Sequence, residues 1–164
     1  MIPTSRSTFL RLAALVLMAS ALVSCSSTKV GDGAKITKVK YYHLISGRPT
    51  IVADPAINFE RDHYLYGAVS KADVLARTGH YYTLFWKVED RTQPVTVRFE
   101  YRQANSGLVT KVQEQEITDI HRSNSTRFQV IGPEYITQGR VSAWKMSILR
   151  GNQELVSSAS NLWN

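Results

Sequence analysis

Alternation of apolar and polar residues along most of the chain predicts β-strands. Between residues 95 and 102, apolar side chains occupy every second position and polar side chains lie between them. Because successive side chains of a strand point to opposite faces, this pattern predicts a strand with one buried face. Residues 80–88 are largely apolar on both faces, which is typical of a central strand, and we expect Trp86 in the core.

The remaining elements follow from shorter patterns. One short helix is predicted at Lys71–Arg77, with Ser70 as its N-cap and Gly79 just past its end. Gly151-Asn152 predicts a tight hairpin turn near the C-terminus. Further extended runs are expected at residues 36–45, 57–69, 108–117, 126–131, 140–149 and 154–163. These runs predict an all-β domain, a single β-sandwich of seven or eight mostly antiparallel strands with at most one short helix.

The strand pattern resembles that of immunoglobulin and fibronectin type III domains. The points of similarity are a tryptophan in a central strand and a terminal hairpin, over about residues 36–163. The cysteine pair of antibody domains is absent, since the chain has only one cysteine. Such a resemblance implies a fold and no particular activity.

The first 24 residues have the layout of a secretory signal peptide. Arg6 and Arg11 provide a basic start without acids, and the 12 residues from Leu12 to Val23 are apolar apart from Ser20. A membrane-spanning helix needs about 20 apolar residues, so this run is too short for a stable span. A buried core helix, the alternative interpretation, is disfavoured because polar residues at helical spacing are almost lacking.

The end of this segment, Leu22-Val23-Ser24-Cys25, resembles the lipobox of bacterial lipoproteins. The resemblance implies cleavage before Cys25 and acyl chains on that residue. Two or three chains anchor a protein firmly, because each buried methylene contributes about 0.8 kcal/mol. Ser26, where some lipoproteins have aspartate, resembles the pattern that sorts lipoproteins to the outer rather than the inner membrane. The alternative is an ordinary signal peptide with a chance cysteine.

The sequence therefore predicts three parts: a cleaved signal peptide at 1–24, a lipidated N-terminus and flexible tether at 25–35, and the sandwich domain at 36–164. Removal of the signal peptide takes away two of the 20 basic residues and none of the 13 acidic ones, which lowers the formal charge from +7 to +5. The longest basic cluster is Lys35, Lys38 and Lys40, with no run of five or more basic residues, so no nucleic-acid partner is expected.

The histidines do not suggest a metal centre. His43, His63, His80 and His121 are spaced at least 17 residues apart, without the close pairs that are typical of metal ligands. His80 could meet His43 across a sheet, but nothing in the sequence demands it. We expect neither a metal nor another cofactor.

Paired carboxylates offer the only route to an enzyme. Glu60 and Asp62 share one face if their segment is a strand, and Glu89 with Asp90 is a second pair. Two acids that face one cleft can hydrolyse glycosidic bonds, so an enzyme that acts on envelope polysaccharide is one alternative.

Tyrosines provide the candidate binding surface. Tyr42, Tyr64, Tyr66 and Tyr81 occur in tyrosine-rich stretches, and Arg61 lies beside one of them. Exposed tyrosines near arginine are favoured at interfaces because they combine a flat apolar face with a polar tip. Ordinary packing within strands is the competing explanation.

The sequence thus predicts a lipid-anchored envelope lipoprotein, a non-catalytic binding or assembly module for an envelope protein or polysaccharide. An exported structural domain without a specific ligand is a third alternative.

Overall fold

The computed structural model describes residues 28–47 and 55–163. The predicted signal peptide lies outside these residues, and so do Leu22, Val23, Ser24 and Cys25. Among the described helices, none is long and apolar enough to cross a membrane.

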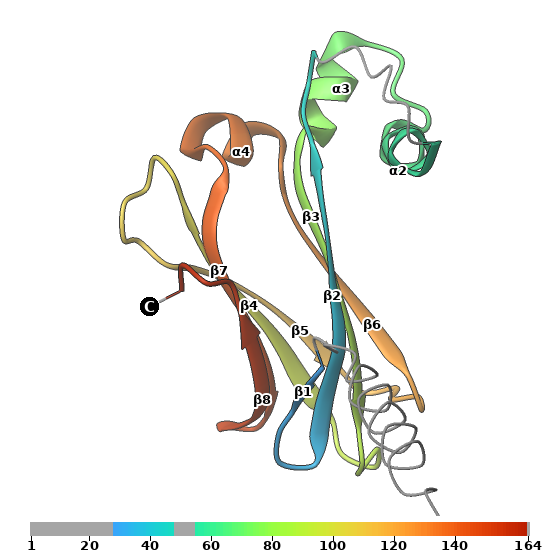
Figure 1. The fold of residues 1–164 in the computed structure, drawn as a ribbon, viewed down its shortest axis with the longest axis vertical. Coiled ribbons are helices and arrows are strands. Elements are labelled where there is room, and N and C mark those ends of the chain that lie inside the picture. Colours follow the sequence, from blue (N-terminus) through green and yellow to red (C-terminus); the bar gives the residue numbers. More distant parts are fainter. Residues whose placement is uncertain (1–27, 48–54, 164) are drawn as a thin grey trace, which may run out of the picture.

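The described residues form two four-stranded antiparallel sheets (Figure 1). The first sheet has the order β1-β2-β3-β6 and the second has the order β5-β4-β7-β8. The strands are β1 (Lys29–Val30), β2 (Ala34–Leu44), β3 (Gly79–Val88), β4 (Val95–Gln103), β5 (Lys111–Ile117), β6 (Asn124–Ile131), β7 (Val141–Arg150) and β8 (Gln153–Ala159). Side chains from both sheets make one hydrophobic core, which includes Trp86, Phe99 and Met146.

The strongest strand predictions are confirmed. In β4 every second residue is buried, from Val95 to Tyr101, and Trp86 is buried on β3 between β2 and β6. Gly151-Asn152 joins β7 to β8, because Arg150 pairs with Gln153. The second face of β3 differs from expectation, since Phe85 is 37% exposed. The core covers only one face of this sheet, so the other face is left for helices and solvent.

Three helices are present in the described residues, so the expectation of at most one was wrong. They are α2 (Pro55–Leu65), α3 (Lys71–Arg77) and α4 (Gly132–Gln138). The predicted α3 is confirmed: the Ser70 hydroxyl accepts a hydrogen bond from the Asp73 N–H, and the Asp73 carboxylate accepts one from the Ser70 N–H.

The extended run expected at 57–69 is wrong over most of its length, because it contains α2. Pro55 stands in the first turn of this helix, where its missing N–H costs nothing. The least exposed positions of α2 include Glu60, Arg61 and Tyr64. A helix whose sheet-facing side is polar lacks the apolar stripe that reveals a helix in a sequence.

Regular structure begins within the expected tether. The Asp32 N–H donates a hydrogen bond of 2.8 Å to the Leu155 carbonyl, which joins the turn after β1 to β8. A Cβ atom at Gly31 would lie 2.0 Å from this same carbonyl oxygen, so only glycine permits the approach. β1 therefore closes one side of the two-sheet core.

A first prediction concerns the buried indole of Trp86. Its Nε1–H donates a hydrogen bond of 2.9 Å to the Thr126 hydroxyl, and both residues are buried. Thr126→Val leaves the indole N–H without an acceptor, so the free energy of unfolding should fall by about 1–3 kcal/mol. Urea denaturation measures this change. Ser125→Ala, at the exposed neighbouring position, should change the free energy of unfolding by less than about 0.5 kcal/mol. Equal effects of the two substitutions contradict a stabilising hydrogen bond between Trp86 and Thr126.

Candidate functional site

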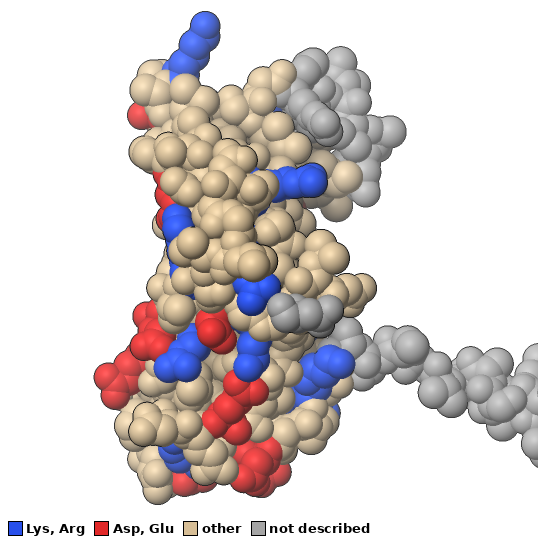
Figure 2. Space-filling view, turned by 90° about the vertical axis from the view of Figure 1, so that its left-hand side faces the viewer, with Lys and Arg blue, Asp and Glu red and all other residues tan. Residues whose placement is uncertain are grey.

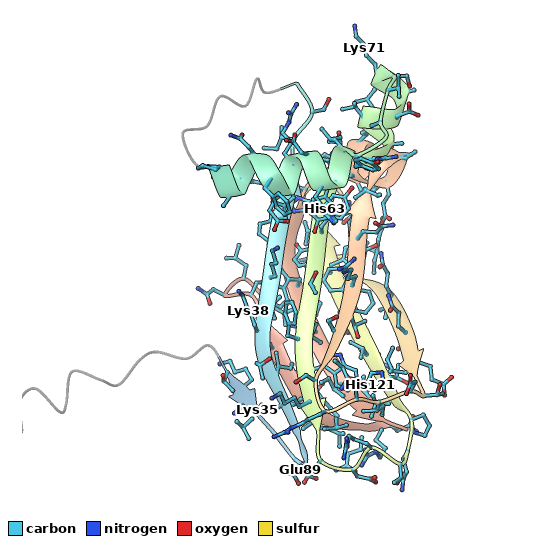
Figure 3. All side chains as sticks on the ribbon, turned by 90° about the vertical axis from the view of Figure 1, so that its right-hand side faces the viewer. Lys35, Lys38, His63, Lys71, Glu89 and His121 are labelled. Carbon is cyan, nitrogen blue, oxygen red and sulfur yellow. The ribbon has the colours of Figure 1, made fainter. Side chains whose placement is uncertain are left out.

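The outer face of the first sheet carries the candidate site. Figure 3 shows α2 crossing the upper part of this face, with His63 where the helix passes over the strands. Tyr42 of β2 and Tyr81 of β3 are paired across the sheet. The ring of Tyr64 from α2 stacks against both, with centroid distances of 5.1 Å to Tyr42 and 3.9 Å to Tyr81. We call these three residues the tyrosine stack.

Polar contacts fix the helices around the tyrosine stack. Lys40 on β2 forms an ion pair with Glu60 on α2. The Arg77 guanidinium of α3 donates a hydrogen bond to the Tyr66 carbonyl just after α2. The Tyr81 hydroxyl donates a hydrogen bond of 2.6 Å to the Arg77 carbonyl. Both helices are thus tied to the outer face of the sheet.

A cleft of about 640 Å³ lies beside the stack. It extends from α2 and α3 across β3 and β6 to the edge of β5. Its lining includes two aromatic rings, three cationic or titratable side chains and three amides: Tyr64, Tyr81, Arg77, Arg127, His63, Gln113, Gln115 and Gln129. A second cleft of about 250 Å³, beneath α2, shares His63, Tyr64, Thr83 and Arg127 with the first.

Two glutamines of β5 form the far wall of the larger cleft. The Gln113 side chain donates a hydrogen bond of 3.1 Å to the Gln129 carbonyl, and the Gln115 side chain donates one of 2.7 Å to the Arg127 carbonyl. These carbonyls belong to β6, the edge strand of the first sheet. The glutamines therefore join the edges of the two sheets and occupy carbonyls that an added strand would need.

The phenols of the stack are neutral over the physiological pH range. Burial raises the pKa of Tyr81 to about 12, and the nearby Tyr64 hydroxyl adds to this effect. Burial also raises the pKa values of Tyr42 and Tyr64. Protonated phenols can donate hydrogen bonds to a ligand but cannot act as bases at neutral pH.

The structure brings together most of the tyrosines that the sequence singled out. Tyr42, Tyr64 and Tyr81 form the stack, and the Arg61 charge is close enough to lower the pKa of Tyr42 in part. Tyr66 is 87% exposed, and we find no ring contact for it within the described residues.

Sequence reasoning missed the cationic and amide side of the cleft. Arg127 lies on β6, far along the chain from the tyrosines, and Arg77 ends α3 only four residues before Tyr81. Gln113 and Gln115 are two residues apart, so a strand places them on one face, but the alternation gives no hint of which strand edge they meet.

The expected carboxylate pair is not formed, because its segment is helical. Residues two apart on an α-helix are about 200° apart around its axis, so Glu60 and Asp62 point to different sides. Glu60 pairs with Lys40, and Asp62 is exposed. The other candidate pair is also engaged structurally, since Asp90 accepts hydrogen bonds from Thr92 and lies 3.6 Å from Arg150.

His43 and His80 meet across the first sheet on its inner side. They are paired in the register of β2 and β3, and their rings stack with centroids 4.0 Å apart. The Val141 N–H donates a hydrogen bond to His80 Nε2, so Nδ1 carries the proton and donates to the Tyr41 hydroxyl oxygen at 2.7 Å. His43 Nε2 is hydrogen-bonded to the Tyr135 hydroxyl of α4 at 2.8 Å.

The histidine pair connects β2 and β3. Within the two described ranges, no three His, Cys, Asp or Glu side chains gather closely enough to hold a metal ion. His63 and His121 lie well apart on the first-sheet side of the molecule (Figure 3). The pair instead fixes α4 and β7 against the first sheet.

No protein-family model matches this chain, and no curated protein or solved structure is significantly similar to it. The function must therefore be argued from the residues and their geometry.

A second prediction concerns pH and His80. Burial, together with the charges of His43 and Arg140, lowers the pKa of His80 to about 3. Between about pH 3 and 6.5 the unfolded state binds a proton at this residue and the folded state does not. Stability should therefore fall as the pH drops below about 6.5, by up to about 2 kcal/mol at pH 5.

Chemical denaturation at about pH 5 and pH 8 measures this loss. His80→Gln should reduce the difference in unfolding free energy between the two pH values. His121→Gln, which alters an exposed histidine, should leave that difference unchanged. An undiminished pH dependence in His80→Gln shows that other groups cause it.

Proposed function

We propose that this protein is a lipid-anchored lipoprotein of the bacterial cell envelope, and that it acts as a non-catalytic binding module through the cleft beside the tyrosine stack. The observation that carries the binding role is the cleft itself, which combines aromatic rings, amides and two arginines that form no ion pair with a described residue in one concave site. Pockets with a few convergent polar groups are the usual sites of ligand binding.

The anchor is supported by the sequence alone. Leu22, Val23 and Ser24 are the recognition signal for processing, and Cys25 is the acylated residue. Ser26 favours the outer over the inner membrane. With this anchor, the protein needs no spanning helix to remain membrane-bound.

The position of the cleft suits an anchored receptor. β1 begins at Lys29, four residues after Cys25, so the fold is held within about 15 Å of the anchor by the reach of an extended chain. β1 lies in the lower half of the molecule, whereas α2, which forms one wall of the cleft, lies at its upper end (Figures 1 and 3). The α2 wall of the cleft is therefore far from the attachment point, which leaves room for an envelope polymer or protein to reach it.

The finer fold assignment is a fibronectin type III-like sandwich. When β2 to β8 are labelled A, B, C, C′, E, F and G in chain order, the sheets become A-B-E and C′-C-F-G. This order supports the resemblance noted in the sequence. On this assignment, α2 and α3 are an insertion between strands A and B that builds one wall of the cleft.

A third prediction tests the anchor. Cys25→Ala removes the acylation site, so the protein should leave the membrane fraction, and the intact mass of the wild-type protein should show a start at Cys25 with acyl chains. Membrane fractionation in high salt and mass spectrometry make these measurements. Cys25→Ser also removes the thiol that would be acylated while keeping nearly the same side-chain size. This second variant should leave the membrane fraction as Cys25→Ala does. A Cys25→Ala protein that stays membrane-bound in high salt refutes the lipid anchor.

A fourth prediction tests the binding role without assuming a ligand. A photo-reactive amino acid at the exposed position Gln129, in the cleft, should form adducts with envelope material in intact cells. The same residue at Arg98, in the second sheet, should form none above background. Gel mobility and mass spectrometry of the purified adducts give the readout. Equal adduct formation at both positions contradicts a role for the cleft.

A further inference from the structure

We infer that the cleft binds an acidic glycan, with Arg127 pairing to a sugar carboxylate and the rings of Tyr64 and Tyr81 lining the sugar path. This inference rests on the proposed binding function and names its ligand class. Four features of the cleft support it: its charge, its aromatic lining, its volume and its closed strand edge.

The charge of the larger cleft is positive, and the acid Glu60 lines only the smaller cleft, where it is paired with Lys40. Arg77, Arg127 and His63 line the larger cleft, and no acidic side chain in the described ranges does so. Arg127 is exposed and forms no ion pair with a described residue. Because an arginine can pair with a carboxylate through two parallel hydrogen bonds, Arg127 is suited to an anionic ligand.

The outer face of the second sheet offers a contrast. Figure 2 shows acidic and basic side chains mixed over the lower half of this side of the molecule. Here Arg98 pairs with Glu114, and Lys145 pairs with Glu154. Two positive charges on that face are paired within the protein, whereas Arg127 forms no ion pair with a described residue.

The lining also suits sugar rings. Sugars present apolar C–H faces, which pack on aromatic rings, and hydroxyl groups, which need donors and acceptors. Tyr64 and Tyr81, whose rings stack on each other 3.9 Å apart, contribute aromatic atoms to the lining, and the side chains of Gln113, Gln115 and Gln129 provide amides. The Tyr81 hydroxyl, which a pKa raised to about 12 keeps protonated, already donates its proton to the Arg77 carbonyl and helps to fix the wall of the cleft.

The two clefts together have room for more than one sugar unit. The larger one, about 640 Å³, is within the usual range for ligand sites. It shares Arg127, Tyr64 and two other residues with the smaller cleft beneath α2. A polymer segment can therefore continue past Arg127 instead of ending there.

The edge of β6 argues against an acidic peptide as the ligand. Extended peptides commonly bind by adding a strand to a sheet edge, through hydrogen bonds to its backbone. At β6 the carbonyls of Arg127 and Gln129 already accept hydrogen bonds from Gln115 and Gln113. Recognition at this site must then depend on side chains, as expected for a glycan.

A fifth prediction tests this ligand class. The full-length protein in detergent micelles is titrated by calorimetry with oligogalacturonate, an acidic sugar chain, and with its methyl-esterified form, which has the same backbone without the charge. We expect binding of the acidic chain, at least tenfold weaker binding of the neutral one, and weaker binding as salt screens the charges.

Matched variants locate the binding. Arg127→Gln and Gln129→Glu, both at exposed positions of the cleft, should each weaken binding about tenfold. Arg122→Gln removes the same charge at an exposed position outside this cleft and should have no effect. The inference is overturned if Arg122→Gln weakens binding of oligogalacturonate as much as the cleft variants do, or if neither cleft variant weakens it. It is also overturned if the methyl-esterified chain binds as tightly as the acidic one. So does a polyglutamate peptide that binds as tightly as the acidic sugar chain.

These outcomes separate the inference from the proposed function. Adducts at position 129 in cells, together with no binding of oligogalacturonate, leave the binding role in place and overturn the ligand class. A wild-type protein that binds oligogalacturonate, but whose intact mass shows no acyl chains, overturns the anchor and retains the cleft.

Discussion

The commitment of one face of β3 to the core is the constraint on which the rest of the structure depends. Leu84 and Trp86 must point inward, because together with the second sheet they form the only extensive apolar interior of the described chain. The pleat of the strand then forces Tyr81 and Thr83 outward. This outward set, with the neighbouring residues of β2 and β6, becomes the floor on which α2 packs and beside which the cleft opens. The core therefore determines where a ligand can bind.

Closure of the sheet edges is the second organising feature. A two-sheet protein exposes backbone groups along its outer strands, and these invite pairing with other chains. On one side, the turn after β1 donates the Asp32 N–H to β8. On the other side, Gln113 and Gln115 of β5 donate to carbonyls of β6. The same two glutamines line the cleft, so the hydrogen bonds that close this sheet edge also shape the candidate site.

Polar groups inside the upper part of the molecule hold the connections between the sheets in place. His80 is hydrogen-bonded to Tyr41 and to the backbone of Val141, and His43 is hydrogen-bonded to Tyr135 of α4. These bonds link the first sheet to the start of β7 and to the helix before it. A neutral His80 satisfies both of its partners, whereas a protonated ring would present an N–H to the Val141 N–H. Stability at this end is thereby coupled to the protonation of one buried imidazole.

The sequence by itself determined the strands with strong alternation, the burial of Trp86, the capped helix α3 and the terminal hairpin, because each of these depends on neighbours within a few residues. It also supplied the tyrosines of the stack. It did not reveal α2, whose side toward the sheet carries Glu60, Arg61 and Tyr64 and so lacks an apolar stripe. Nor did it reveal that Arg127 and Gln113 join Tyr81 in one cleft. That meeting depends on strand order and register between distant segments, which are decided by how the two sheets bury their apolar faces together and not by any local pattern.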